Sequence, residues 1–236
     1  MNKSPHLWTR RTKILEPNRE LVLPARIAGF WKLYAVRVTD GRRRELSGWF
    51  PNIITDLGLD KVGAGADWVS SCNVGTGNST PDAGDTALDA QVAITSNRTN
   101  ISGAANQTAD RYVRAQTTFR FAAGDAEGNL AEIGIVTGTV AQQFSRALIL
   151  DGGGSPTTIT ILSDEVLDAV YVIRTYPPLT DLETTVVVSG TTHDVVVRAS
   201  EVDQWGMIGG GFVPPVGWAA GATSKGAALY PSTSTL

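Results

Sequence analysis

The 236-residue sequence predicts a mainly β protein: an antiparallel β-sandwich with a short helix, an extended N-terminal arm and an irregular C-terminal tail. The first observation is the strict alternation of polar and apolar residues in RYVRAQTTFRF, residues 111–121, whose polar side bears arginines. The second is the turn signals that separate such segments, among them Asp40-Gly41 and the glycines between Asp151 and Pro156. The third is the scarcity of helical periodicity. Together they favour a sandwich of short antiparallel strands.

The individual elements follow from the same patterns. A helix is expected over residues 52–63, broken or loosened by Gly58, and Asp85-Thr86 is a candidate cap for a helical turn over residues 87–90. The triple Arg42-Arg43-Arg44 is expected at a hairpin tip or edge, which it would keep soluble. Strands are expected over residues 33–39, 42–50, 72–74, 111–121, 130–137, 144–150, 157–162 and 166–176, with a loop or weak edge strands over 91–110.

Four regions are predicted. Residues 1–30 form an extended basic arm, because prolines interrupt each candidate helix, and residues 31–178 form the β-sandwich domain. Residues 179–205 form a β-hairpin extension, with His193 as a solvated residue near its turn. Residues 206–236 form a Gly/Pro-rich tail that cannot build a core of its own. No apolar run is long enough for a membrane helix and the N-terminus lacks a secretory signal, so we expect no membrane insertion and no export.

Charge is distributed unevenly along the chain. Residues 1–44 hold 11 basic and 3 acidic side chains, which gives them a net charge of +8. The remaining residues carry a net charge of −11. Such an arm can lie on the acidic body of a neighbouring copy, remain a solvated face or bind nucleic acid. The sparse aromatic residues between its basic ones favour protein docking, and no nucleic acid is expected. The docking residues predicted in the arm are Arg10, Arg11, Lys13, Arg19 and Arg26.

The C-terminal tail carries isolated aromatic residues. Phe212, Trp218 and Tyr230 are spaced far apart among glycines, prolines and small residues. Isolated aromatics on a flexible strap are natural anchors for pockets on a partner, and packing back on the same domain is the equal alternative. We predict partner docking for these three residues as well.

The stretch CNVGTGNSTPDAGDTAL, residues 72–88, resembles the start of a nucleotide site in its glycine pair. A P-loop requires a terminal Gly-Lys-Ser/Thr, and a dinucleotide fingerprint requires a third glycine that opens a helix. Neither follows Gly77, and Pro81 moves Thr80 away from helical geometry. The stretch therefore predicts a strand end that continues into an ordered loop.

No specific catalytic, cofactor or metal set is found in the sequence. Cys72 is expected to be a small buried residue, and His6 and His193 are too far apart in sequence to form a typical zinc cluster with it. The carboxylates are expected in solvated turns, with a calcium site or a carboxylate pair assembled only by folding as the alternative. These carboxylates are Asp82, Asp85, Asp89, Asp125, Glu127, Asp164, Glu165 and Asp168.

Four segments in order, NIITDLGLDKVG, CNVGTGNSTPDAGDTALDAQVA, YVRAQTTFRFAAGDAEGNLAEIGI and FSRALILDGGGSPTTITILSDEVLDAVYVIRTYPP, resemble structural proteins of tailed bacteriophages. These proteins are encoded in the tail modules and are often labelled tail fibre or baseplate-associated proteins. The resemblance covers about Trp49 to Pro178 and carries no catalytic motif. In that family VGTG, a polar loop and D-T-x-L belong to the β-rich scaffold. The resemblance implies that Gly75 and Gly77 let a strand end turn sharply beside its neighbours.

The resemblance implies a non-enzymatic virion structural protein at the tail tip, the baseplate or a fibre attachment site. Such a viral tail protein assembles in the bacterial host cytoplasm as a symmetric homo-oligomer, and links the tail to a fibre or to neighbouring subunits. Its partners would be copies of itself, other tail proteins and a host surface receptor. One alternative is a receptor- or glycan-binding module, in which Trp68, Trp205 and Trp218 line an exposed groove. A tail-associated hydrolase with paired carboxylates is a third class.

Overall fold

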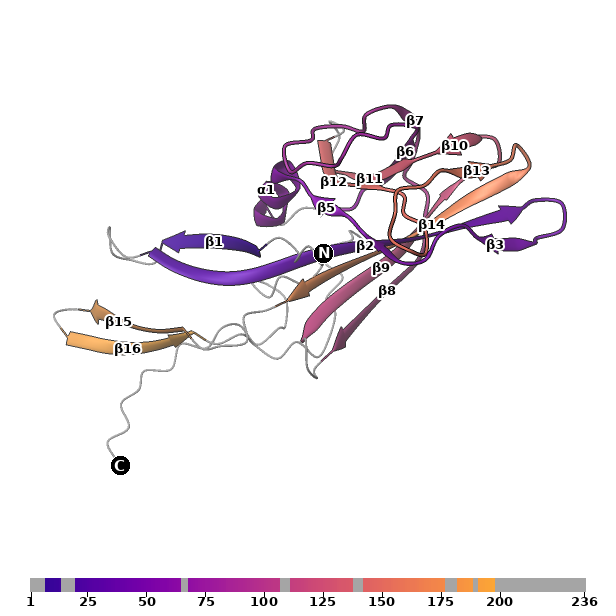
Figure 1. The fold of residues 1–236 in the computed structure, drawn as a ribbon. Helices are drawn as coiled ribbons and strands as arrows, with labels where there is room; N and C mark the ends of the chain where they lie inside the picture. The colour runs from indigo at the N-terminus through magenta and orange to yellow at the C-terminus, as the bar shows by residue number, and fades with distance from the viewer. Residues whose placement is uncertain are drawn as a thin grey trace.

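The computed structural model describes residues 7–13, 20–64, 68–106, 111–137, 142–176, 182–188 and 191–197. These residues form a mainly β protein of antiparallel strands with one helix, as the sequence predicted. Figure 1 shows the strands gathered in layers, with the helix beside the upper layer. The tail aromatics Phe212, Trp218 and Tyr230 lie outside the described residues, as does Arg19.

A seven-stranded sheet forms one layer. Its order is β1 (Leu7–Lys13), β2 (Glu20–Arg37), β14 (Glu165–Tyr176), β9 (Tyr112–Phe121) and β8 (Arg98–Asn106), and β3 (Arg43–Glu45) and β4 (Phe50–Pro51) also pair with β2. β14 pairs with β2 over its whole length, from Glu165 opposite Arg37 to Tyr176 opposite Arg26. This long central pair supports the rest of the layer.

A five-stranded sheet forms the other layer. Its order is β5 (Ile53–Ile54), β12 (Gln142–Leu148), β11 (Glu132–Thr137), β6 (Ser71–Gly75) and β7 (Gln91–Thr95). The helix α1 (Asp56–Ala64) follows β5 and packs on β12. Two further antiparallel pairs are β10 (Gly128–Leu130) with β13 (Ile159–Ile161), and β15 (Leu182–Val188) with β16 (Thr191–Val197).

The core lies between the two main sheets, where alternate residues of each strand face inward. Trp31 on β2 and Tyr171 on β14 are buried from one side, while Ile133 on β11 and Phe144 on β12 are buried from the other, and all belong to one hydrophobic cluster. The ring centroids of Trp31 and Tyr171 are 4.5 Å apart. Burial raises the pKa of Tyr171 to about 12, so the phenol stays neutral. The sandwich prediction therefore describes the architecture correctly.

The predicted start of the sandwich domain at Trp31 falls inside a continuous strand. β2 runs from Glu20 to Arg37, and it pairs with β14 from Arg26 onward. The residues before Arg26 pair with β1 instead, with Leu7 opposite Arg26 and Lys13 opposite Glu20. Pro24 obscured this strand in the sequence, because proline is usually excluded from strand interiors.

The sequence predicted that Gly58 breaks or loosens the helix, and this prediction is wrong. α1 continues through Gly58, and a Cβ at this position would overlap the backbone carbonyl oxygen of Phe144. The glycine therefore brings the helix close to β12 and does not break it. The helical turn predicted over residues 87–90 is absent from this described segment, because Asp85 is an ion-pair partner there and not a cap.

The loop-rich region 91–110 contains two strands that separate into different sheets. β7 is the edge strand of the five-stranded sheet, and β8 is the edge strand of the seven-stranded sheet. The predicted C-terminal hairpin is confirmed as β15 and β16, but His193 lies within β16 opposite Val186, away from the turn. A two-stranded pair alone is marginally stable in water.

Candidate functional site

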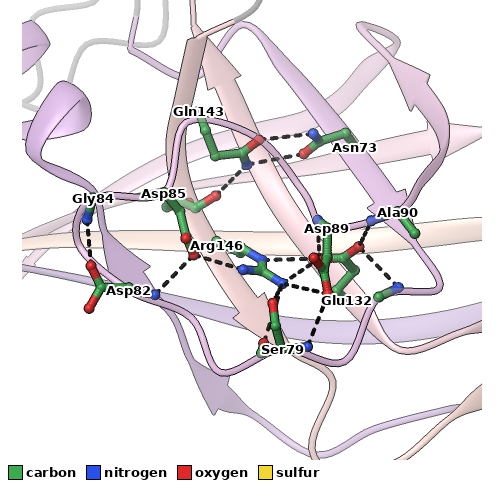
Figure 2. A network of polar contacts seen from close by, with 12 residues as sticks. Asn73, Ser79, Asp82, Gly84, Asp85, Asp89, Ala90, Glu132, Gln143 and Arg146 are labelled. Carbon is green, nitrogen blue, oxygen red and sulfur yellow. Dashed lines mark hydrogen bonds and ion pairs between the residues drawn. The ribbon is translucent and has the colours of Figure 1, made fainter.

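The most developed polar site of the described residues lies on the outer face of the five-stranded sheet, where the loop 76–90 covers β11 and β12. Figure 2 shows Arg146 between Asp85 of this loop and Glu132 of the sheet. Both Glu132 and Arg146 were on strands that the sequence predicted. Glu132 lies on the polar side of β11, but the loop covers it, so its exposed fraction is 0%.

Glu132 is saturated with hydrogen bonds from the loop. Its Oε1 accepts the backbone N–H groups of Gly77 at 3.1 Å and Ala90 at 2.7 Å, and its Oε2 accepts that of Asp89 at 3.0 Å. The glycine loop that resembled a phosphate cradle does bind an anion, but the anion is the protein's own carboxylate. A buried carboxylate with three backbone donors and a guanidinium has its charge compensated.

Arg146 extends from β12 and joins the sheet to the loop. Its Nε donates to Glu132 Oε2 at 3.0 Å, its Nη2 forms an ion pair with the same oxygen at 2.9 Å, and its Nη1 donates to Asp85 at 2.8 Å. Its Nη2 also reaches the hydroxyl of Ser79 at 2.8 Å. Burial lowers the pKa of Arg146, but the hydrogen bond to Asp85 and the charges of Glu132 and Asp85 outweigh it, so the pKa lies above its ordinary value.

Three glycines make room for this network. A Cβ on Gly77 would overlap the Cβ of Asp89, and one on Gly75 would lie 2.6 Å from Glu132 Oε1. Neither residue has a positive φ, so close packing and not a left-handed backbone conformation is the reason for glycine here. Gly134 lies between Asn73 and Arg146 in the register, and a Cβ there would overlap Gln143 Nε2. Close approach of polar groups requires these glycines.

An amide pair extends the same polar row. Asn73 Nδ2 donates to Gln143 Oε1 at 3.0 Å, and Gln143 Nε2 donates to the carbonyl oxygen of Ser145 at 2.6 Å. Asn73 Nδ2 also reaches Gln91 Oε1 on β7 at 3.0 Å. The network thus runs across four strands and one loop. We name it the Glu132–Arg146 lock, because it holds the loop 76–90 on the sheet.

Some of the carboxylates predicted in solvated turns lie in loops, and others lie on a strand. Glu165 is buried and accepts two hydrogen bonds from Arg44, at 2.9 and 2.6 Å, and Asp168 pairs with Arg120 at 2.7 Å. The hydrogen bond from Arg44 lowers the pKa of Glu165 to about 2. For these two residues the prediction of a solvated turn is wrong, since both lie on β14. Arg44 is also more than a solubilising edge residue.

Among the described residues, no group of three or more His, Cys, Asp or Glu is arranged to hold a metal ion. Asp82 and Asp85 in the loop 76–90 bind backbone N–H groups and Arg146. Cys72 is buried on β6, and burial raises its pKa well above the ordinary value, so it stays a thiol, as expected for a small core residue. None of the described helices has the length and apolar character of a membrane span.

The predicted docking residues are placed only in part. Arg10, Arg11 and Lys13 lie on β1, and Arg26 lies on β2 with its guanidinium 4.2 Å from the ring centroid of Tyr176. Trp68 was proposed to line a glycan groove; it is fully buried and stacks on Phe144 with a centroid distance of 6.3 Å, so that proposal is wrong for this residue. Trp205 and Trp218 lie outside the described residues.

Sequence reasoning missed two features of the described surface. Trp49, between β3 and β4, is 52% exposed. Arg114 on β9 and Arg174 on β14 are opposite each other in the register, although 60 residues separate them in the sequence. The alternation in residues 111–121 gave the direction of Arg114, but only strand pairing could reveal its neighbour.

Comparison of the chain with protein-family models, with curated proteins and with solved structures finds no match.

Proposed function

We propose that this chain is a non-enzymatic structural protein of a bacteriophage virion. It assembles as a symmetric oligomer at the tail tip, the baseplate or a fibre attachment site, and links the tail to a fibre or to neighbouring subunits. The order of segments between about Trp49 and Pro178, which resembles phage tail-module proteins, gives the proposal its setting. The β-architecture is compatible with that setting, but fold alone does not define a function.

The observation that carries the proposal is a pair of two-stranded ribbons that continue from one end of the sandwich. β2 pairs with β14 only from Arg26 onward, and its earlier residues pair with β1. β14 ends at Tyr176, directly opposite Arg26, and the chain continues to the β15–β16 pair, which is a separate sheet. Figure 1 shows the β1–β2 ribbon extending past the end of β14.

Two-stranded ribbons gain stability when a further strand or surface covers them. A sandwich with such extensions suits a subunit that docks on neighbouring chains in an assembly. The Glu132–Arg146 lock supports the same role, because it uses its buried charges to fasten a loop to the sheet. Its donors and acceptors are bonded to one another, as in a rigid scaffold.

A truncation tests this proposal. Deleting residues 1–25 removes β1 and its partner segment of β2, but retains the pairing from Arg26 to Arg37 with β14. The truncated chain should keep its thermal transition and should fail to enter phage particles, as measured by mass spectrometry of purified particles. Incorporation equal to that of the full chain would contradict a docking role for the arm.

The exposed Trp49 favours one second candidate, a receptor- or glycan-binding module of the phage tail. An exposed indole provides a flat apolar surface on which a sugar ring packs. In that case the isolated protein would bind components of a glycan array, and Trp49→Ala would abolish the signal. An array without binding would leave the structural role as the better explanation.

A further inference from the structure

One end of the outer face of the seven-stranded sheet combines arginines with aromatic rings. The Arg174 guanidinium lies 4.8 Å from the ring centroid of Phe30 and 4.6 Å from that of Tyr112. The Tyr112 ring meets Tyr176 at 5.7 Å in an edge arrangement. We name this surface the cationic–aromatic end; it comprises Arg26, Phe30, Tyr112, Arg114, Arg174 and Tyr176.

The positive charges of this end lack carboxylate partners among the described residues. Arg174 is directly opposite Arg114, and like charges in opposed positions of an antiparallel pair repel each other. The Arg174 Nε is buried and makes no hydrogen bond within the described part of the chain. An unsatisfied guanidinium nitrogen beside a second arginine is an unfavourable arrangement unless an anion joins it.

The opposite end of the same sheet provides the contrast. There Lys32 pairs with Glu45 at 2.9 Å, Arg44 with Glu165 at 2.6 Å and Arg120 with Asp168 at 2.7 Å. These three basic residues each have a carboxylate partner and Arg43 lies over the Tyr34 ring, whereas the three arginines of the cationic–aromatic end have no such partner in the described part of the chain. The difference indicates that the missing anions come from outside the described residues.

The geometry favours a carboxylate as the anion. The rings of Phe30 and Tyr112 restrict the Arg174 guanidinium, which lowers the entropy lost when it binds a ligand. A restricted planar guanidinium matches a carboxylate with two parallel hydrogen bonds. The neighbouring Arg114 and Arg26 add positive potential to the same area.

A second copy of this chain has carboxylates at the right place to supply such an anion. Asp125 and Glu127 are exposed in the loop that follows Phe121, at the far end of the strand β9 that begins with Tyr112. Arg114 and this loop thus lie at opposite ends of β9, so a contact between them would join two copies head to tail.

We propose that the cationic–aromatic end docks the carboxylate-bearing loop 122–127 of a second copy of this chain. The contact is heterologous, so its repetition forms a ring where the rotation between copies closes. The inference rests on the proposed function for the oligomer and goes further by naming the two surfaces that meet. Arg114 and Arg174 would bind Asp125 or Glu127 of the neighbouring copy.

Sedimentation velocity of the full chain over a range of concentrations tests the proposal. The wild-type chain should self-associate at about 50 mM salt and dissociate at about 500 mM, because exposed charges are screened. Arg114→Gln should weaken association about tenfold or more. Lys61→Gln is the control, since it removes a positive charge from α1, which packs on the other sheet, and it should leave association unchanged.

The melting temperature separates docking from a structural role. Arg114→Gln removes one of two opposed like charges, so its melting temperature should equal or exceed that of the wild type. A sharper form uses charge reversal: Arg114→Glu and Glu127→Arg should each fail to associate alone, and an equimolar mixture should associate. A mixture that stays monomeric would overturn the assignment of the loop 122–127 as the occupant.

Two other outcomes would also overturn the proposal. If the Arg114→Gln and Lys61→Gln variants associate as strongly as the wild type, this surface is excluded, while the proposed virion role, tested by particle incorporation, stands. The wild-type chain could instead bind a fluorescent oligothymidylate. If Arg114→Gln abolishes that binding and leaves self-association intact, the surface binds nucleic acid.

Discussion

Glu132→Gln is the most informative single change to the scaffold, because it keeps the shape of the side chain and removes its charge. The carboxylate accepts hydrogen bonds from Gly77, Asp89, Ala90 and Arg146, and its exposed fraction is 0%. In the variant an amide N–H group faces backbone donors, and the buried guanidinium loses one of its two close carboxylates.

The size of the effect follows from the cost of breaking a buried ion pair, about 3–5 kcal/mol. Asp85 remains on Arg146 at 2.8 Å, so we expect the lower end, about 3 kcal/mol. With a denaturant slope of about 2 kcal/mol per molar urea, the unfolding midpoint should fall by about 1.5 M. The slope itself should not change, because the fold is retained.

Urea unfolding of wild type, Glu132→Gln and Glu127→Gln measures this effect. Glu127 is exposed, so its variant removes the same charge without breaking the lock and should stay within about 0.5 kcal/mol of wild type. A Glu132→Gln variant as stable as Glu127→Gln would refute the reasoning, since the buried pair would then contribute nothing to the free energy of unfolding.

Three further predictions concern the glycine loop, acid stability and the thiol. Gly77→Ala should cost about 1–3 kcal/mol in urea unfolding through overpacking, whereas Gly152→Ala, with no atom within 4 Å of the new Cβ, should be near neutral; equal stabilities would contradict the close packing. Glu165 has its pKa lowered from 4.5 to about 2, so its stabilisation is complete above pH 4.5 and is lost as the pH falls toward 2; the unfolding midpoints of wild type and Glu165→Gln should converge over that window, and a constant difference would speak against the ion pair. Cys72 should resist a thiol reagent in the native protein and react fully in urea; rapid native labelling would disprove its burial.

The strands with strict alternation were predictable from the sequence. Residues 112–121 form β9 and residues 165–176 form β14, close to the predicted ranges, because one side of each strand packs into the core. The continuous strand through Pro24 was not predictable, because its pairing with two different partners on either side of Arg26 depends on tertiary context.

Sequence patterns could not predict the Glu132–Arg146 lock. Glu132 is opposite Leu148 and Gly75, and Arg146 is opposite Gly134, so the two charges meet diagonally across a glycine. Their loop partners come from residues 77–90, more than 40 positions away. Alternation gave Glu132 a polar side of its strand, but it does not reveal which loop covers the outer face of a sheet.

Strand register explains the cationic–aromatic end in the same way. The sequence indicated an arginine-bearing polar side on residues 111–121, but the neighbour of Arg114 is set by the pairing of β9 with β14. The exposed position of Trp49 and the buried position of Trp68 likewise depend on the order of strands in two sheets. Local composition contains no information on either.

A cryo-electron microscopy reconstruction of phage particles purified from the source of the sequence tests the central claim most directly. The account predicts density for this sandwich at the tail tip, baseplate or fibre junction, repeated with the symmetry of the tail, with the β1–β2 ribbon against a neighbouring subunit. Particles that assemble without this chain, confirmed by mass spectrometry of the same preparation, would contradict a structural role in the virion.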